Sequence, residues 1–429
     1  MRVLMFGWEF PPHIAGGLGT ACKGIVEGLA HNGVETLFVM PSASGDEDQS
    51  CTTILNASDV AVEYVSETVD EFLDKVKFIN VDSNIVPYVD PDEYFEAIER
   101  MKRERKTETT IGFGQKFKFS GKYGANLLEE VSRYAQVGGT IALQHKGEFD
   151  VIHAHDWLTY LAGIAAKELT GKPLVVHVHA TSFDRGTDDM VDSRVYAIEK
   201  RGMEAADKVV AVSELTRNIV INKYGINPDK VVAVHNAVDF SGRENLEVQR
   251  GVKDKIVTFL GRITFQKGPE YFIDAAAKVL KRTDGVRFVM AGSGDMMNRA
   301  IRQVARLGIS DRFHFTGFLR GADVQKMFAL SDVYIMPSVS EPFGISPLEA
   351  MRSNVPSIIS FQSGAAEILK YAFKVNFWDV DAMADDIYAL IKYPALADFA
   401  AKHGYDEVNA LKWDHAAAKL KDIYYSLTK

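Results

Sequence analysis

The sequence has 429 residues, which exceeds the usual size of one domain and predicts two or three domains. Hydrophobic residues make up 47% and charged residues 25%, as in an ordinary globular protein. The formal net charge of −9 argues against general nucleic-acid binding. The only cysteines, Cys22 and Cys51, exclude a disulfide framework and fit a reducing compartment. No apolar run approaches the roughly 20 residues of a membrane-spanning helix, so we expect a cytoplasmic protein.

Short apolar segments alternate with helical patterns along the whole chain. Runs of Val and Ile without alternating polar residues indicate strands buried on both faces, which are typical of parallel sheets covered by helices. The pattern therefore predicts an α/β protein. The expected strands are residues 2–6, 36–40, 151–153, 174–178, 209–212, 231–234, 256–260, 286–291, 313–315, 333–336 and 357–360. The expected helices include residues 20–32, 159–169, 194–205, 270–281, 297–307, 322–329 and 382–391.

The alternation is interrupted at two places. A polar segment without a helix or strand pattern lies near residues 240–255, and it predicts a boundary between two Rossmann-like domains, residues 1–245 and 246–412. An amphipathic helix is expected over residues 413–429. Residues 94–123 are interpreted as an insertion, in which Lys116 and Lys118 alternate with phenylalanines. This insertion could contact a polymer or a partner, or it could simply pack locally; the sequence leaves both interpretations open.

A glycine-rich segment, residues 11–20, follows the first strand and opens a helix. Gly16 and Gly17 would let the backbone approach a ligand closely, and the start of a helix favours phosphate. The segment does not match the dinucleotide fingerprint G-x-G-x-x-G, and an ordinary turn is the alternative.

Two later strands end in histidines. One ends in His153 and His155, followed by Asp156 and Trp157. The acid suits sugar hydroxyls, and the aromatic ring suits the face of a pyranose. The next ends in His177 and His179. Histidines at neighbouring strand ends raise the question of a metal site, but no carboxylate-rich or cysteine-containing set flanks them, and we expect no metal. For each histidine, a structural hydrogen-bonding role is the alternative to a functional one.

The second half repeats this placement of charge at strand ends. Arg262 and Lys267 follow its first strand, where a diphosphate could be gripped by both cations. Gly292 and Ser293 end the next strand, which is a weak signal alone.

The segment of residues 340–351 carries two carboxylates, Glu341 and Glu349, across a turn between a buried strand and a helix. One acid could accept protons from sugar hydroxyls, and the other could hold a ribose diol. The amides of Phe343, Gly344 and Ile345 lie near the helix start, where anions bind well. Two surface glutamates on an ordinary loop are the alternative.

Taken in order, together with residues 212–213 and 235–239, these motifs resemble retaining glycosyltransferases of the GT-B fold. The nearest resemblance is to glycogen/starch synthase and related α-glucan glucosyltransferases. It implies two Rossmann-like domains whose parallel sheets face a central cleft. The first domain would hold the acceptor, the second would hold a nucleotide sugar, and the C-terminal helix would pack back on the first.

The resemblance also implies roles for single residues. Arg262 and Lys267 would neutralise the leaving diphosphate without a metal, and Glu341 would contact the donor sugar. His179 would lie near the sugar's 6-hydroxyl, with its carbonyl facing the developing positive charge. The implied donor-binding residues are Gly16, Gly17, Gly292, Ser293, Phe343, Gly344, Ile345 and Glu349, and the implied acceptor-binding residues are Asp156 and Trp157.

The predicted activity is transfer of glucose from a nucleoside-diphosphate glucose to the non-reducing end of an α-1,4-glucan, without a cofactor. Ile14 stands where bacterial starch and glycogen synthases usually carry a lysine, so ADP-glucose and UDP-glucose both stay open as donors. A lipid or small-molecule acceptor, a sugar-nucleotide epimerase and a catalytically silent glucan-binding protein are the alternatives. We expect no nucleic-acid partner and no membrane span; the oligomeric state is left open.

Overall fold

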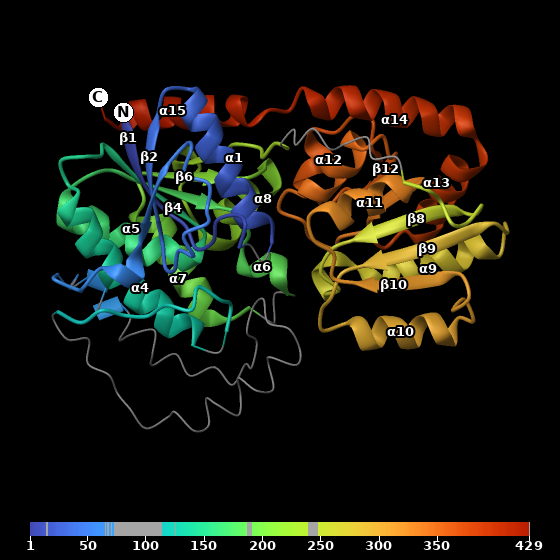
Figure 1. Ribbon diagram of the computed structural model, residues 1–429, viewed down its shortest axis with the longest axis horizontal. Helices are drawn as coiled ribbons and strands as arrows, with labels where there is room; N and C mark the ends of the chain where they lie inside the picture. Colours follow the sequence, from blue (N-terminus) through green and yellow to red (C-terminus); the bar gives the residue numbers. More distant parts are fainter. Residues whose placement is uncertain are drawn as a thin grey trace, which may run out of the picture. The chain divides into compact units, whose positions relative to one another are not determined.

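A computed structural model describes residues 1–428 except 14–15, 65, 67, 70, 73–113, 125, 187–190 and 239–247 (Figure 1). The chain forms two compact units, Met1–Asn236 with Trp413–Lys429, and Ala237–Lys412. The boundary predicted at residue 245 and most of the predicted insertion lie outside the described residues. Of the helices among the described residues, none has both the length and the apolar composition that a membrane crossing requires.

The first unit is built on a seven-stranded parallel sheet covered by helices. Its elements are β1 (Arg2–Phe6), α1 (Gly17–His31), β2 (Glu35–Met40), β3 (Thr53–Asn56), η1 (Ala57–Asp59), α4 (Leu127–Gln144), β4 (Val151–His155), α5 (Trp157–Thr170), β5 (Leu174–Val178), α6 (Ser182–Arg185), α7 (Ser193–Ala205), β6 (Lys208–Ala211), α8 (Glu214–Tyr224), η3 (Pro228–Lys230), β7 (Val231–Ala233) and α15 (Trp413–Leu427). The strand order is β3-β2-β1-β4-β5-β6-β7. The strand order reverses direction between β1 and β4, which makes that position the topological switch point.

The second unit repeats this topology with six parallel strands. Its elements are β8 (Lys255–Leu260), η4 (Phe265–Lys267), α9 (Pro269–Leu280), β9 (Val286–Ala291), α10 (Met297–Arg306), β10 (Phe313–Gly317), α11 (Ala322–Leu330), β11 (Val333–Met336), α12 (Ile345–Arg352), β12 (Ser357–Ser360), η5 (Gly364–Glu367), β13 (Phe373–Val375), α13 (Val380–Lys392) and α14 (Pro394–Asn409). The order β10-β9-β8-β11-β12-β13 places the switch point between β8 and β11. The predicted α/β class with two Rossmann-like parallel-sheet domains is confirmed.

The central strands are buried along their whole length, as the unbroken apolar runs predict. All residues of β4, β5 and β11 are buried, because helices cover both faces of each sheet. The edge strands β3 and β13 were not predicted from the sequence. They are short and half-buried, so they carry no continuous apolar run.

The described end of the predicted insertion packs on the first unit. Phe117 and Phe119 are 7% and 4% exposed and belong to its core, and the Phe119 ring meets Tyr134 edge-on at 6.1 Å. A single bridge pairs Lys116 with Ala61. The alternation of lysine and phenylalanine at these positions therefore reflects an extended segment with one buried face, and the two rings do not offer a binding surface.

Helix α15 returns to the first unit and packs along α1 (Figure 1). Trp413 is 4% exposed, and it lies directly over two glycines of α1. A Cβ atom at Gly28 would stand 2.7 Å from the Trp413 carbonyl oxygen. Lys421 donates a hydrogen bond of 2.7 Å to the carbonyl oxygen of Asn32, just beyond α1. The two helices can approach this closely at Gly24 and Gly28 because these residues have no side chain between the helices.

This packing predicts that Gly28→Ala destabilises the first unit. The added methyl group must displace backbone, and such overpacking typically costs about 1–3 kcal/mol, more than the helix propensity gained. We expect a lower unfolding midpoint in urea. Gly147→Ala is the matched control, because a Cβ there meets no atom within 4 Å. Equal midpoints for the two variants would contradict this account of the α1–α15 contact.

Candidate functional site

The predicted site residues of each unit gather at the carboxyl edge of its sheet. In the second unit, the loops after β8 and β11 flank the switch point and carry Arg262, Lys267 and Glu341. In the first unit, the loops after β1 and β4 flank the other switch point and carry Gly16 and Asp156. In open parallel sheets, ligands bind in the crevice outside such strand ends. The sequence motifs therefore lie where a ligand site is expected in each unit.

Backbone hydrogen bonds hold the loops of the second unit to one another. The amide of Ile263, after β8, donates to the carbonyl of Ser293, after β9, at 2.8 Å. The amide of Val339, after β11, donates to the carbonyl of Gln266 at 2.8 Å. Three neighbouring strand ends are thus joined into one surface, which fixes the backbone beneath the predicted donor-binding residues.

The central charges of this surface form an ion pair. The Lys267 ammonium contacts Glu341 Oε2, and the two side chains are 19% and 9% exposed. The Ser338 hydroxyl lies 3.5 Å from the same carboxylate oxygen. Arg262 donates a hydrogen bond of 3.1 Å to Gln266 Oε1. The sequence placed these residues on separate loops, and the structure brings Lys267 and Glu341 into contact.

Two glycines at this edge have backbone requirements that other residues do not meet. Gly292 has φ 147°, and a Cβ atom there would lie 1.8 Å from the carbonyl oxygen of Gly261. Gly344 has φ 95° and is the N-cap of α12. The first amides of α12 therefore start at Ile345, and N–H groups of a first helical turn have no partner within the helix. Glu349 lies on the same helix and is half-buried.

In the first unit, the glycine loop opens α1 over a buried acid. Gly16 is the N-cap of α1, and a Cβ atom at Gly16 would meet nothing within 4 Å. Glu9 is 5% exposed, and its Oε1 accepts a hydrogen bond of 3.0 Å from the amide of Gly19. A carboxylate at a helix N-terminus is favourable, and here it occupies one of the amides available there. Ile14 lies outside the described residues.

Asp156 occupies a strained turn between β4 and α5. Its φ of 62° and ψ of 166° are rare for a residue with a Cβ atom, and such conformations cost about 1–3 kcal/mol. Its side chain is buried, and burial raises its pKa to about 7 even though Arg185 Nη2 lies 3.7 Å from its carboxylate. A carboxyl group that titrates near neutrality can hold or release a proton under ordinary conditions.

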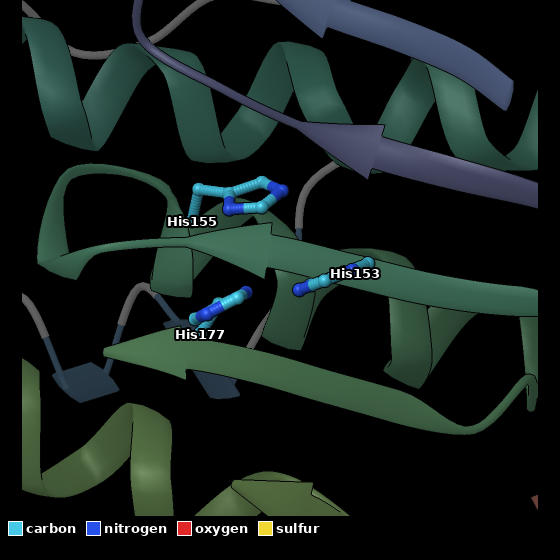
Figure 2. Close-up of side chains that lie close together, drawn as sticks. All are labelled: His153, His155 and His177. Atoms are coloured by element: carbon cyan, nitrogen blue, oxygen red, sulfur yellow. The ribbon is translucent and has the colours of Figure 1, made fainter. Parts of the chain in front are cut away.

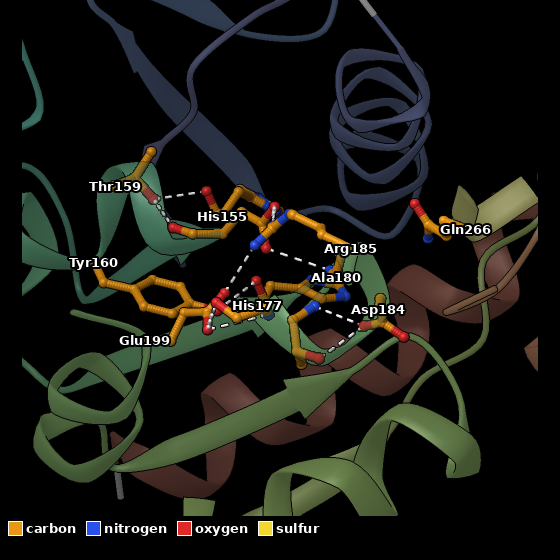
Figure 3. A network of polar contacts seen from close by, with 12 residues as sticks. His155, Thr159, Tyr160, His177, Ala180, Asp184, Arg185, Glu199 and Gln266 are labelled. Atoms are coloured by element: carbon orange, nitrogen blue, oxygen red, sulfur yellow. Dashed lines mark hydrogen bonds and ion pairs between the residues drawn. The ribbon is translucent and has the colours of Figure 1, made fainter. Parts of the chain in front are cut away.

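Sequence reasoning missed the partners of Asp156 (Figure 3). Arg185 bridges Asp156 to Glu199, donating 3.0 Å from Nη1 to Glu199 Oε1. Glu199 is 2% exposed, also accepts from the Ser182 hydroxyl at 2.7 Å, and contacts Tyr224. Burial raises the pKa of Glu199 as well. Arg185 and Glu199 stand on two different helices with no motif around them, so only the fold reveals the network.

One of the two predicted acceptor-binding residues is enclosed in the core. Trp157 is 1% exposed and belongs to the core of the first unit. It is the first residue of α5 and directly follows the strained turn at Asp156. An enclosed ring presents no face to a pyranose in this structure, and the acceptor-binding role of Trp157 stays a prediction. The large apolar surface of the Trp157 side chain explains why it lies in the core.

The four histidines at the ends of β4 and β5 form one cluster, of which Figure 2 shows His153, His155 and His177. Ring nitrogens of these three lie within 4.8 Å of one another. Burial lowers the pKa of all four, to about 3 for His153 and His179, so the rings are neutral. Nδ1 of His155 lies 2.9 Å from Nε2 of His179.

Neutral imidazoles are ligands for transition metals, but this cluster is a poor match for an ion. The His153 and His155 rings stack face to face, with centroids 4.3 Å apart and planes at 26°. Lone pairs lie in the ring planes, so those of stacked rings run side by side and do not converge. A divalent charge in this core would also need a compensating anion. We therefore assign His153, His155 and His179 to hydrogen bonding and stacking, and His177, whose ring nitrogens have no hydrogen-bond partner among the described residues, to stacking.

Two sequence models of known families match the chain. The model of group 1 glycosyl transferases matches residues 243–406, and that of glycosyltransferase family 4 matches residues 120–241. An uncharacterized glycosyltransferase of Methanocaldococcus jannaschii, MJ1607, is 28% identical over 99% of this chain and 98% of its own length. A glycogen synthase of Mycobacterium tuberculosis is 22% identical over 99% of this chain and 94% of its own length.

Solved structures share the fold. Sucrose-phosphate synthase from Thermosynechococcus elongatus has a TM-score of 0.70 at 17% identity, covering 99% of this chain and 98% of that one. HepE of Anabaena, in complex with UDP and glucose, has a TM-score of 0.65 at 16% identity, with both chains covered completely. The chain is thus similar to glycosyltransferases in each half of its sequence, and its two parallel-sheet units share the fold of these solved structures.

The raised pKa of Asp156 predicts a pH-dependent cost to stability. Between pH 3.8, the ordinary value, and about 7, the unfolded chain releases this proton while the folded chain keeps it. Rising pH therefore favours unfolding, by at most about 1.4 kcal/mol per pH unit, and the effect levels off above pH 7. The side chain at position 156 of the Asp156→Asn variant does not titrate. The free energy of unfolding of this variant, relative to that of the wild type, should therefore increase from pH 4 to pH 7.

The measurement is urea unfolding of both proteins at several pH values. The difference between them isolates Asp156, because the histidines, whose lowered pKa values act with the opposite sign, are present in both. The Asp156→Asn variant also lacks the ion pair with Arg185, which shifts the curve by a constant at high pH. The exposed Asp422→Asn is the control. A difference that is independent of pH would contradict the assigned protonation.

Proposed function

We propose that this protein is a retaining glycosyltransferase that transfers glucose from a nucleoside-diphosphate glucose to the non-reducing end of an α-1,4-glucan. The observation that carries the proposal is the surface of the second unit. There Lys267 and Glu341 form an ion pair at the switch point, Arg262 lies in the same loop as Lys267, and the first amides of α12 follow the loop that carries Glu341. Cations and helix amides suit a diphosphate, and a buried carboxylate suits sugar hydroxyls. A cytoplasmic location is part of the proposal.

The proposed chemistry follows from the charges. As the bond to the sugar breaks, negative charge grows on the leaving phosphate, and Arg262 and Lys267 stabilise it. The acceptor hydroxyl attacks from the same face, and the leaving phosphate takes its proton. Glu341 offers the donor sugar a carboxylate whose charge is balanced by Lys267. Because two cations are provided by the chain, this scheme assigns no role to a metal ion.

In the first unit, Asp156 and His179 are proposed to face the acceptor and the donor sugar. Asp156 would accept a hydrogen bond from an acceptor hydroxyl, and its position is supported by Arg185. Glu349 is proposed to hold the ribose, and the Gly16–Gly17 loop is proposed to approach the diphosphate. The remaining donor contacts are proposed to come from Gly292, Ser293, Phe343, Gly344 and Ile345.

A second candidate keeps the reaction and changes the acceptor. The enclosure of Trp157 removes the aromatic platform expected for a glucan chain, and a lipid or a small hydroxylated molecule needs no such platform. The glucan is kept as the first proposal because the resemblance extends over nearly the whole chain.

The test is a donor panel in a buffer containing excess EDTA. ADP-glucose and UDP-glucose are each supplied with and without glycogen, and released nucleotide is measured together with the anomeric configuration of the new bond. We expect one donor to give glycogen-dependent release and an α bond. No release with glycogen from either donor, or activity that requires added Mg²⁺ or Mn²⁺, would overturn the proposal as stated. Release with a small polyol only would favour the second candidate.

Arg262→Ala is predicted to lower turnover without unfolding the second unit. Loss of one well-placed transition-state donor typically costs about 3 kcal/mol, which is about two orders of magnitude in kcat. Arg262 is preferred to Lys267 because Lys267→Ala would also leave the Glu341 carboxylate buried without its cation.

The variant is compared with Lys281→Ala, a change at an exposed lysine of the same unit. Turnover and the thermal unfolding midpoint are measured for both. Turnover of Arg262→Ala within a few-fold of the control would rule out the assigned role.

A further inference from the structure

We propose that His155 is a positioning residue that fixes the tautomer of His179, so that His179 offers an N–H group from Nδ1 to the donor sugar. The inference rests on the proposed function for its consequence, whereas the tautomer itself can be observed independently. The sequence analysis offered His155 only a structural hydrogen-bonding role, without a partner.

The two rings are brought together by the parallel pairing of β4 and β5. His155 is the last residue of β4 and lies opposite His177 in the register, and His179 follows the end of β5. Nδ1 of His155 and Nε2 of His179 are 2.9 Å apart. Both rings are neutral because burial lowers their pKa values. A hydrogen bond between neutral imidazoles requires one N–H and one lone pair, so the tautomers of the two rings are coupled.

The second nitrogen of His155 decides which ring donates. Its Nε2 is buried and has no hydrogen-bond partner among the described residues. If Nε2 carried the proton, a second buried N–H group of the cluster would lack an acceptor, since neutral His177 already has no partner for either ring nitrogen among the described residues. Orphaned buried N–H groups are rarer than under-satisfied acceptors. The proton of His155 is therefore placed on Nδ1, and it donates to Nε2 of His179. His179 must then carry its own proton on Nδ1.

The orientation of His155 is itself held by its neighbours. Its ring stacks on His153, and Nδ1 of His153 lies 2.5 Å from the Tyr424 hydroxyl of α15. The carbonyl oxygen of His155 accepts from the Thr159 hydroxyl at 2.8 Å. Because the His155 ring is packed between fixed partners, its Nδ1–H group keeps one direction, toward His179. The ring also connects α15 to the predicted active-site histidine.

The tautomer has a consequence for recognition of the sugar. A hydroxyl group can either donate to or accept from a neutral imidazole, and the tautomer chooses between these. With the proton on Nδ1 of His179, the hydroxyl must accept, and its own proton is left for another acceptor. Loss of His155 would let His179 take either tautomer, so part of the enzyme would offer a lone pair where a donor is needed.

The first measurement is NMR of the ¹⁵N-histidine-labelled full chain, with His179 assigned by a His179→Gln variant. Wild type should show His179 protonated at Nδ1. His155→Asn should keep this tautomer, because the Asn amide nitrogen can take the place of Nδ1 as donor. His155→Leu should shift His179 toward protonation at Nε2. A wild-type His179 protonated at Nε2, or a metal ion found on the ring nitrogens of the purified protein, would overturn the proposal.

The second measurement separates positioning from folding. His155→Leu should reduce kcat/KM for the nucleotide sugar about ten-fold, the value of one hydrogen bond, and leave inhibition by the free nucleoside diphosphate unchanged. His155→Asn should restore most of the activity. Equal losses in both variants would indicate a structural role only and would contradict the proposal. If the chain transfers no sugar at all, the proposed function fails, and the NMR result still decides the tautomer.

Discussion

Every described strand of both sheets runs parallel to its neighbours, so each connection must cross over one face of the sheet before the next strand begins. This constraint buries the strands on both faces and brings all their carboxyl ends to one edge of each unit. The loops that carry Lys267, Glu341 and Asp156 start at that edge for this reason. The switch point separates the two halves of each sheet and leaves room there for a ligand.

Charge is handled differently in the two units. The second unit keeps a cation and an acid in contact, Lys267 with Glu341, and carries a further cation, Arg262, at the same strand end. The first unit buries acids around a single guanidinium, and burial raises the pKa values of Asp156 and Glu199. Burial lowers the pKa values of the four histidines at the ends of β4 and β5, which keeps them neutral. The arrangement in the second unit suits an anion whose charge grows during a reaction, and the arrangement in the first unit suits neutral hydroxyl groups.

Most of the secondary structure could be predicted from the sequence, and the failures share a physical cause. The central strands have unbroken runs of Val and Ile, so their positions were predicted within two residues. The edge strands β3 and β13 are half-buried and carry no continuous apolar run, so they were not predicted. Helices α4 and α8 were also not predicted, because their mixture of polar and apolar residues was not distinguished from that of a loop. The Phe117–Phe119 segment was interpreted as a possible binding surface, because the alternation of lysine and phenylalanine does not show whether the rest of the domain buries the phenylalanine face.

The sequence by itself determined the fold class, the strand ends at which charged residues stand, and the resemblance to GT-B glycosyltransferases, because these depend on local patterns and short motifs. Only the tertiary structure decided which side chains meet. The contact of Lys267 with Glu341 joins residues 74 positions apart, and the contact of His153 with Tyr424 joins residues 271 positions apart. The enclosure of Trp157, the network of Arg185 and the hydrogen bond between His155 and His179 are likewise set by packing, since burial and partners far along the chain leave no mark on a local sequence pattern.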